Sequence, residues 1–287
     1  MAKSQSHTLG EFIGAFFEDM MKKPIREFAE KNGLYLDTAG SRKAREGKKV
    51  TWTDIHGSNH DLDFVIEKGG TEENIGEPVA FIELAWRRYT KHSRNKVQEI
   101  QGAVNPIYEK YRFGKPFKGA ILSGQFTGKA LEQLRNDGFH VLYIPFEKLV
   151  RAFSIYGFDV CFDEDTKESD ICKKYGAVSK KSNRQLLEKV REEILYSCKA
   201  EIDTFVAELS AACHRKVRSV RILPLHGICM EVSDTQHAID FINSYSAIPS
   251  HQELQYIEVF VYYNNGTSIH CMFKEKEEAV EFLEGLR

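Results

Sequence analysis

The sequence predicts an α/β (α+β) protein: a mixed β-sheet flanked by helices, followed by a smaller carboxyl-terminal α+β region with two β-β-α units. Three patterns predict this class. Apolar residues recur at helical spacing near the amino terminus, and short apolar runs then alternate with amphipathic segments. The last part of the chain contains two similar strand–strand–helix patterns, at 217–242 and 256–283.

The first half of the chain alternates between helices and strands. A helix is expected from Thr8, which opens a capping box with Glu11, to about Asn32. Because the segment 79–86 is apolar on both faces apart from Glu83, it should be the central strand of its sheet. The other expected strands are 34–36, 50–53, 62–66, 118–124 and 139–145, and the other helices are 93–111, 127–136 and 146–156. Strand–helix–strand order requires crossovers, so the sheet should be partly parallel.

Composition divides the chain into three regions. Residues 1–160 form the expected α/β core, and 161–183 are polar without periodicity, which predicts a linker or loop. Residues 184–287 contain a predicted long helix at 184–213 and the two β-β-α units. We expect this last region to serve dimerisation or contact with DNA.

The bulk numbers indicate an ordinary globular chain, with 42% hydrophobic and 29% charged residues. No apolar run approaches the ~20 residues that span a bilayer, and the amino terminus lacks a secretory pattern, so a cytoplasmic protein with no membrane partner is expected. The scattered cysteines are expected to be reduced thiols. No P-loop or dinucleotide motif is present, so no nucleotide cofactor is expected.

Two carboxylates give the strongest chemical signal. Asp63 precedes the apolar run Phe64-Val65-Ile66, and Glu83 lies inside the apolar strand 79–86. A carboxylate in so apolar a setting is expensive unless a cation neutralises it. The sequence therefore predicts a site for a hard metal ion, although salt bridges at exposed strand ends would account for the same residues.

The element order, with Asp63 on one strand and Glu83 on the next, resembles the PD-(D/E)XK nuclease superfamily of restriction and repair endonucleases. The resemblance covers roughly Leu9 to Phe153 and implies a restriction-endonuclease-like core. It implies that Asp63, Glu83 and the backbone carbonyl of Leu84 bind Mg²⁺, for which Mn²⁺ can substitute. A Glu on the first helix often completes such sites, and Glu18 matches best, with Glu11 about two turns away.

The chain departs from the family pattern at Ala85, where the family has a catalytic Lys. Lys96, at the start of the following helix, is the first candidate to replace it, and Lys91 is the second. Gln98 and Gln101 on the same helix are candidates for contact with metal-bound water or the DNA backbone.

Clustered basic residues predict a phosphate-binding surface despite a net charge of −2. The candidate DNA-binding residues lie in the segments 41–49 and 86–101: Arg42, Lys43, Arg45, Arg87, Arg88, Lys91, Arg94, Gln98 and Gln101. The resulting expectation is a Mg²⁺-dependent DNA endonuclease, type II restriction-like and homodimeric. Two alternatives remain: a catalytically impaired nuclease fold that binds DNA or a partner, and a structure-specific repair nuclease.

Overall fold

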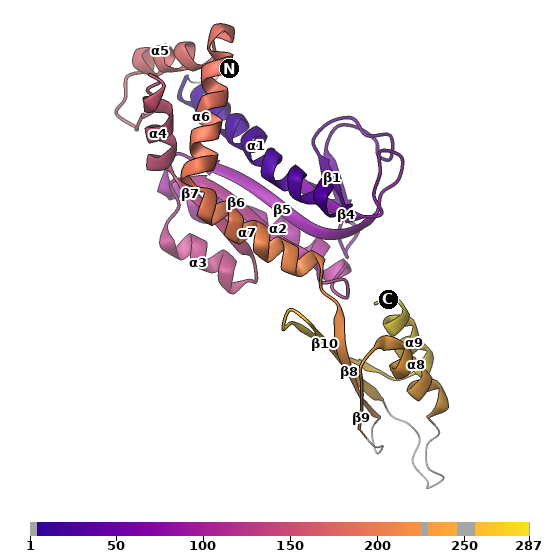
Figure 1. Cartoon of the computed structure of the whole chain (residues 1–287). Helices are drawn as coiled ribbons and strands as arrows, with labels where there is room; N and C mark the ends of the chain where they lie inside the picture. Colours follow the sequence, from indigo (N-terminus) through magenta and orange to yellow (C-terminus); the bar gives the residue numbers. More distant parts are fainter. Residues whose placement is uncertain (1–4, 225–228, 246–255, 287) are drawn as a thin grey trace. The chain divides into compact units, whose positions relative to one another are not determined.

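The computed structural model describes residues 5–224, 229–245 and 256–286 (Figure 1). The chain divides into two compact units, residues 1–210 and 211–287, which we call the amino-terminal unit and the carboxyl-terminal unit. Both combine helices with β-sheet, which confirms the predicted α/β (α+β) class. Among the described residues, no helix is both long enough and apolar enough to cross a membrane.

A mixed five-stranded sheet forms the centre of the amino-terminal unit. Its strand order is β1-β4-β5-β6-β7. The strands are β1 (Tyr35–Thr38), β4 (Phe64–Lys68), β5 (Glu77–Arg87), β6 (Phe117–Gly124) and β7 (His140–Pro145). The β1–β4 and β4–β5 pairs are antiparallel, whereas β5–β6 and β6–β7 are parallel. The predicted central position of the strand containing Glu83 is confirmed.

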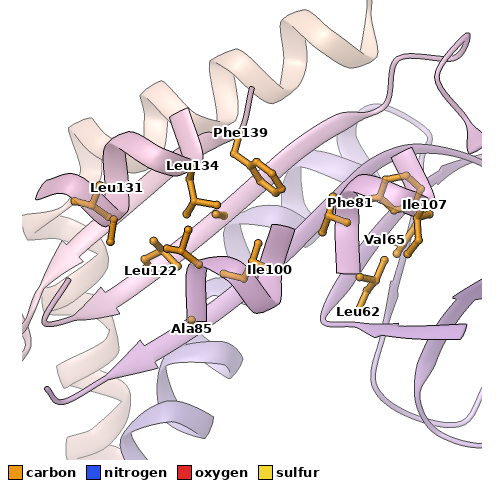
Figure 2. Close-up of a cluster of buried hydrophobic side chains, with 14 of the residues drawn as sticks. Leu62, Val65, Phe81, Ala85, Ile100, Ile107, Leu122, Leu131, Leu134 and Phe139 are labelled. Atoms are coloured by element: carbon orange, nitrogen blue, oxygen red, sulfur yellow. The ribbon is translucent and has the colours of Figure 1, made fainter. Parts of the chain in front are cut away.

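Helices cover the two faces of this sheet. They are α1 (Gln5–Lys31), α2 (Ser93–Lys110), α3 (Gly128–Asn136) and α4 (Phe146–Ile155). Figure 2 shows Phe81 and Ala85 of β5 in one apolar cluster with Ile100 and Ile107 of α2. Trp86, on the opposite face of β5 because side chains alternate, lies against Gly14 of α1.

The strand expected at 62–66 is divided. A separate two-stranded hairpin pairs β2 (Val50–Thr53) with β3 (Asn59–Leu62), and β4 begins only at Phe64. Asp63 lies between β3 and β4, where the chain leaves the hairpin and enters the main sheet. This change of sheet fixes the place of the candidate metal ligand.

The segment 161–183 is not a linker between units. It contains helix α5 (Glu168–Val178), whose Ile171 and Val178 are buried, and the short 3₁₀ helix η2 (Lys181–Asn183). A second 3₁₀ helix, η1 (Thr90–His92), precedes α2. The boundary between units falls instead after Ser210.

Two helices, α6 (Arg184–Ser197) and α7 (Lys199–Cys213), replace the single helix expected at 184–213. All of α6 and most of α7 belong to the amino-terminal unit. The ring of Phe205 on α7 packs edge-on against Phe117 of β6, with centroids 5.3 Å apart. The apolar stripe of this region therefore helps to cover the main sheet.

The carboxyl-terminal unit is an antiparallel four-stranded sheet of order β11-β10-β8-β9. Its elements are β8 (Val217–Pro224), β9 (Met230–Val232), α8 (Thr235–Ser244), β10 (Ile257–Tyr263), β11 (Ser268–Phe273) and α9 (Lys276–Glu284). Val220 and Val259 from the sheet share a buried cluster with Ile239 of α8 and Leu283 of α9. The predicted pair of β-β-α units is confirmed.

Candidate active site

Asp63 and Glu83 lie side by side at the β4–β5 pair. Phe64 of β4 is opposite Ile82 of β5 in the antiparallel ladder. Asp63 and Glu83 are the next residues along the two chains and therefore lie opposite each other. The Leu84 backbone N–H donates to Asp63 Oδ2 at 2.7 Å, and the Asp63 N–H donates to Glu83 Oε1 at 3.3 Å. Each carboxylate is thus held by a backbone donor beside the other acid.

Burial and mutual repulsion disfavour negative charge at this pair. Glu83 is only 6% exposed. Its pKa is raised to about 8, first by burial and then by the neighbouring Asp63, and Lys96 partly opposes this. Burial also raises the pKa of Asp63, against the lowering effects of the Leu84 N–H and Lys96. The two acids therefore resist full ionisation, and an added cation would favour it.

Glu18 of α1 is the third acid of the site. Burial raises its pKa first, and repulsion from Asp63 raises it further. Glu18 in turn contributes to the raised pKa of Glu83. The sequence-based choice of Glu18 over Glu11 fits this geometry, because Glu11 is exposed and pairs with His7 at 3.1 Å.

Lys96 of α2 is the lysine whose charge acts on both carboxylates. Its side chain is 20% exposed and lies 3.3 Å from Glu99. Lys91, the second candidate, is an exposed residue that pairs with Glu164. The structure thus separates the two lysines and places Lys96 at the site.

The packing of Ala85 explains why no lysine stands at that position. Ala85 is 5% exposed and belongs to the apolar cluster beneath α2, together with Phe81 and Val97. A lysine here would have its stem among apolar side chains, and it would avoid a high desolvation cost only if its ammonium group reached the cavity that Ala85 also lines. A lysine that enters from α2 avoids this cost.

A cavity of about 560 Å³ adjoins the acidic site. Glu18 and Lys96 lie in its wall, as does Leu84, whose N–H binds Asp63. The other lining residues come from α1, the end of β5 and the segment after α4: His7, Gly10, Glu11, Gly14, Phe17, Ala85, Trp86, Arg87, Arg88, Tyr89 and Phe162. A ligand in this space would reach both the acids and the basic end of β5.

Arg42 is not available to DNA, contrary to the sequence-based expectation. Its side chain is 2% exposed and makes a two-pronged contact with Glu67, at 2.7 and 2.8 Å. It also binds Asp37 at 2.9 Å and donates to the carbonyls of Thr71 and Asn74. The guanidinium therefore ties the loop after β1 to the loop after β4.

Arg45 is likewise a loop-building residue and not a DNA contact. It binds Asp37 at 3.1 Å and donates to the carbonyls of Thr38 and Gly40, both at 2.9 Å. Lys43, by contrast, is exposed and pairs with Glu73 at 3.1 Å. The prediction that Arg42 and Arg45 bind DNA was wrong because nothing in the segment 41–49 indicates that Asp37 and Glu67 pair with its arginines.

The basic residues near α2 have mixed surroundings. Arg87 donates to the Trp86 carbonyl at 2.9 Å and lies 3.7 Å from Glu99, and Arg94 is exposed. Gln98 is exposed on α2. Gln101 instead turns to α3, where it donates to Asp137 at 2.8 Å and accepts from Gln133 at 2.6 Å. Of the two glutamines, only Gln98 is free of such side-chain contacts in the structure's described part.

Sequence reasoning missed Lys22 and the cavity wall. Lys22 lies one turn after Glu18 on α1, and its charge lowers the pKa of that acid. The i, i+4 spacing of Glu18 and Lys22 was a visible signal. Gly10 and Gly14 repeat at the same spacing and line the cavity, but a glycine pair in a helix does not by itself indicate a cavity.

Within residues 5–224, 229–245 and 256–286, no group of three or more His, Cys, Asp or Glu side chains is arranged to hold a metal ion. Any metal at this site would therefore rest on the Asp63–Glu83 pair, with backbone oxygen and water as further ligands.

Comparison with known proteins identifies no relative. No protein-family model matches the chain, and no curated protein matches it. A solved structure of a protein of unknown function, AF1548, aligns over 69% of this chain and 98% of its own, at 11% identity and a TM-score of 0.29. At that TM-score the likeness carries no argument about function.

Proposed function

We propose that this protein is a divalent-metal-dependent nuclease that hydrolyses phosphodiester bonds in DNA. One observation carries the proposal: the buried Glu83 and the half-buried Asp63 form an acidic pair, with Lys96 acting on both. In a structural role such a pair would be neutralised by close cations, as Glu67 is by Arg42. Here, among the described residues, no ion pair neutralises either acid, and Glu18 and Lys96 beside them line a cavity.

The donor chemistry of the site fits Mg²⁺, with Mn²⁺ as a substitute. Magnesium prefers oxygen ligands and is commonly held by one or two carboxylates while it keeps several waters. Asp63 and Glu83 would supply the carboxylates, and the carbonyl of Leu84 would supply a backbone oxygen. When bound, the metal would polarise the phosphate and lower the pKa of the attacking water.

The chain's own residues have separable roles in this scheme. The Leu84 N–H and the Asp63 N–H orient the two carboxylates. Lys96 would stabilise negative charge that develops on the phosphate, the task of the lysine that the family pattern puts at position 85. Glu18 would accept hydrogen bonds from water or carry a proton, because its raised pKa brings it closer to neutrality.

The restriction-like and homodimeric character belongs to the same proposal. A double-strand cut needs two active sites, which a twofold-symmetric dimer supplies. The cavity favours a second candidate, a structure-specific nuclease, because a walled space suits an unpaired strand better than a duplex groove.

A cleavage assay tests the proposal. Plasmid, single-stranded and branched DNA would be incubated with Mg²⁺, Mn²⁺ or EDTA, using wild type, Asp63→Asn and Glu83→Gln. Asp61→Asn is the matched control, because Asp61 is exposed and pairs with Lys49. We expect metal-dependent cutting that both site variants lose and the control keeps. Binding without cutting on any substrate would instead favour the catalytically impaired DNA-binding protein.

A further inference from the structure

Arg88 presents an unusual guanidinium in the wall of the 560 Å³ cavity. Its Nε is buried without a hydrogen-bond partner, and within the described ranges no carboxylate forms an ion pair with it. Its guanidinium lies over Phe146 at 4.3 Å and near Phe162 at 5.2 Å, measured to the ring centroids. The pKa of the Asp163 carboxyl is lowered, and the charge of the nearby Arg88 is the smallest of several causes.

Other half-buried arginines of this unit show what Arg88 lacks. Arg191 lies over an aromatic ring too, at 4.8 Å from Phe16, and its Nε is also unpartnered. Its terminal nitrogens nevertheless bind Asp19 at 2.8 Å and pair with Glu188. The guanidinium of Arg88 is therefore positioned by aromatic rings while its donors stay unused, which prepares it for an anion that enters the cavity.

The position of Arg88 relates that anion to the acidic site. Arg88 follows Glu83 by five residues at the end of β5, so the two are separated by at most about 17 Å at the ~3.3 Å rise of a strand. The same cavity is lined by Glu18 and Lys96, which act on the acids, and by Arg88. A strand with a phosphate near Asp63 and Glu83 would extend toward Arg88 by a few nucleotides.

The shape and lining of the cavity indicate an unpaired strand. Its volume is in the range of pockets that enclose a small ligand, about 300–1,000 Å³, and not a duplex. Gly10 and Gly14 of α1 line the cavity, and so does Trp86, which packs directly against the two glycines. Aromatic walls of this kind stack bases without reading their sequence.

We propose that this cavity binds the unpaired nucleotides of a single-stranded DNA segment next to the cut bond, with one of their phosphates on Arg88. This inference rests on the proposed nuclease function and names its substrate class: DNA with a single-stranded end, flap or gap. A blunt duplex would be a poor ligand, because its paired strand cannot enter the walled space.

Binding in EDTA tests this without requiring cleavage. Fluorescence anisotropy would compare a single-stranded oligonucleotide, a duplex with a single-stranded overhang and a blunt duplex. We expect wild type to bind the first two at least tenfold more tightly than the blunt duplex. Binding should also change the emission of Trp86, one of the two tryptophans in the chain.

Two variants address the cavity in different ways. Arg88→Met keeps an apolar stem between the rings but removes the charge, and Gly14→Leu adds bulk against Trp86 in the cavity wall with Arg88 intact. Each should weaken overhang binding about tenfold and leave blunt-duplex binding unchanged. Arg151→Met is the matched control, because Arg151 is exposed on α4. Thermal melts would confirm that both variants are folded.

Three outcomes would overturn the inference. They are equal binding of blunt and overhang DNA by wild type, unchanged overhang binding by both cavity variants, and competition by a mononucleotide or inorganic phosphate as strong as that by the oligonucleotide. The nuclease proposal is judged separately by metal-dependent cutting and its loss in Glu83→Gln. Binding and cutting of overhang DNA by Arg88→Met at the wild-type level would keep the nuclease and remove the single-strand site.

Discussion

Two buried charge clusters in the amino-terminal unit have opposite balance. The Arg42 guanidinium donates to the carboxylates of Asp37 and Glu67 at 2.7–2.9 Å. It also donates to a backbone carbonyl of a neighbouring loop. Around Glu83, three acids gather, with Lys96 acting on two of them. The first cluster is complete within the chain, and the second needs a ligand.

This difference separates structure from function better than charge content does. A buried salt bridge that is fully hydrogen-bonded holds a loop in place, and removal of one of its partners strongly destabilises the fold. A group of acids that raise one another's pKa resists ionisation in the metal-free fold and is expected where an added cation completes the site. The predictions below test whether the two clusters really differ in this way.

The largest expected effect is on cleavage. Glu83→Gln keeps the size of the side chain but removes a metal-binding charge, so the cleavage rate should fall about 1,000-fold or more, which corresponds to about 4 kcal/mol of transition-state stabilisation. Glu67→Gln changes the same residue type in the Arg42 cluster. Its folded fraction should cleave at a rate close to wild type, measured per folded molecule. Equal losses in both variants would contradict the distinction.

The next largest effect is on stability. Arg42→Met leaves Glu67 buried without its cation and Asp37 with Arg45 alone, and this should lower the free energy of unfolding by about 3–5 kcal/mol. At about 2–4 °C per kcal/mol, the melting temperature of this unit should fall by roughly 10 °C. Lys43→Met is the control, since its exposed pair with Glu73 should contribute at most about 1 kcal/mol. Similar melting of the two variants would show that the Arg42 cluster is not structural.

The sequence identified the acids and the lysine of the Glu83 cluster, but it did not identify the acids that bind Arg42. Asp63 and Glu83 could be selected because each stands beside an apolar run, and the antiparallel register that joins them follows from the strand order. The burial of Arg42 depends on contacts with residues 25 or more positions away in the sequence, and no local pattern predicts such contacts. The helix α5 was missed for a related reason: only Ile171 and Val178 of its apolar residues are buried, too few for a clear helical period.

A third effect is the pH dependence of the metal-free protein. The folded state holds the Glu83 proton up to about pH 8, whereas an ordinary Glu loses it near 4.5. Between these values the folded state binds more protons than the unfolded state, so stability should fall as the pH rises. Asp63 and Glu18, whose pKa values are also raised, should likewise make stability fall as the pH rises.

Thermal melts in EDTA from pH 5 to pH 8 measure this slope. Glu83→Gln should flatten it and melt higher than wild type at pH 8, because the buried charge is gone. A wild-type protein that becomes steadily more stable over this range would exclude the raised pKa of Glu83.

The smallest expected effect comes from Lys96. Lys96→Met removes the cation that favours ionisation of both acids, so metal affinity should fall along with charge stabilisation at the phosphate. We expect a 10–100-fold lower cleavage rate, about 1.4–2.8 kcal/mol. Lys91→Met, on the exposed Glu164 pair, should cleave normally. The reverse result would assign the missing lysine to Lys91.

The most direct test is Mn²⁺ binding, followed by electron paramagnetic resonance at pH 7 without DNA. Wild type and Asp61→Asn should bind one ion per chain at the carboxylate pair, and Asp63→Asn and Glu83→Gln should lose that ion. An identical binding curve for all four proteins, or no binding by wild type, would contradict the claim that the uncompensated acids form a metal site.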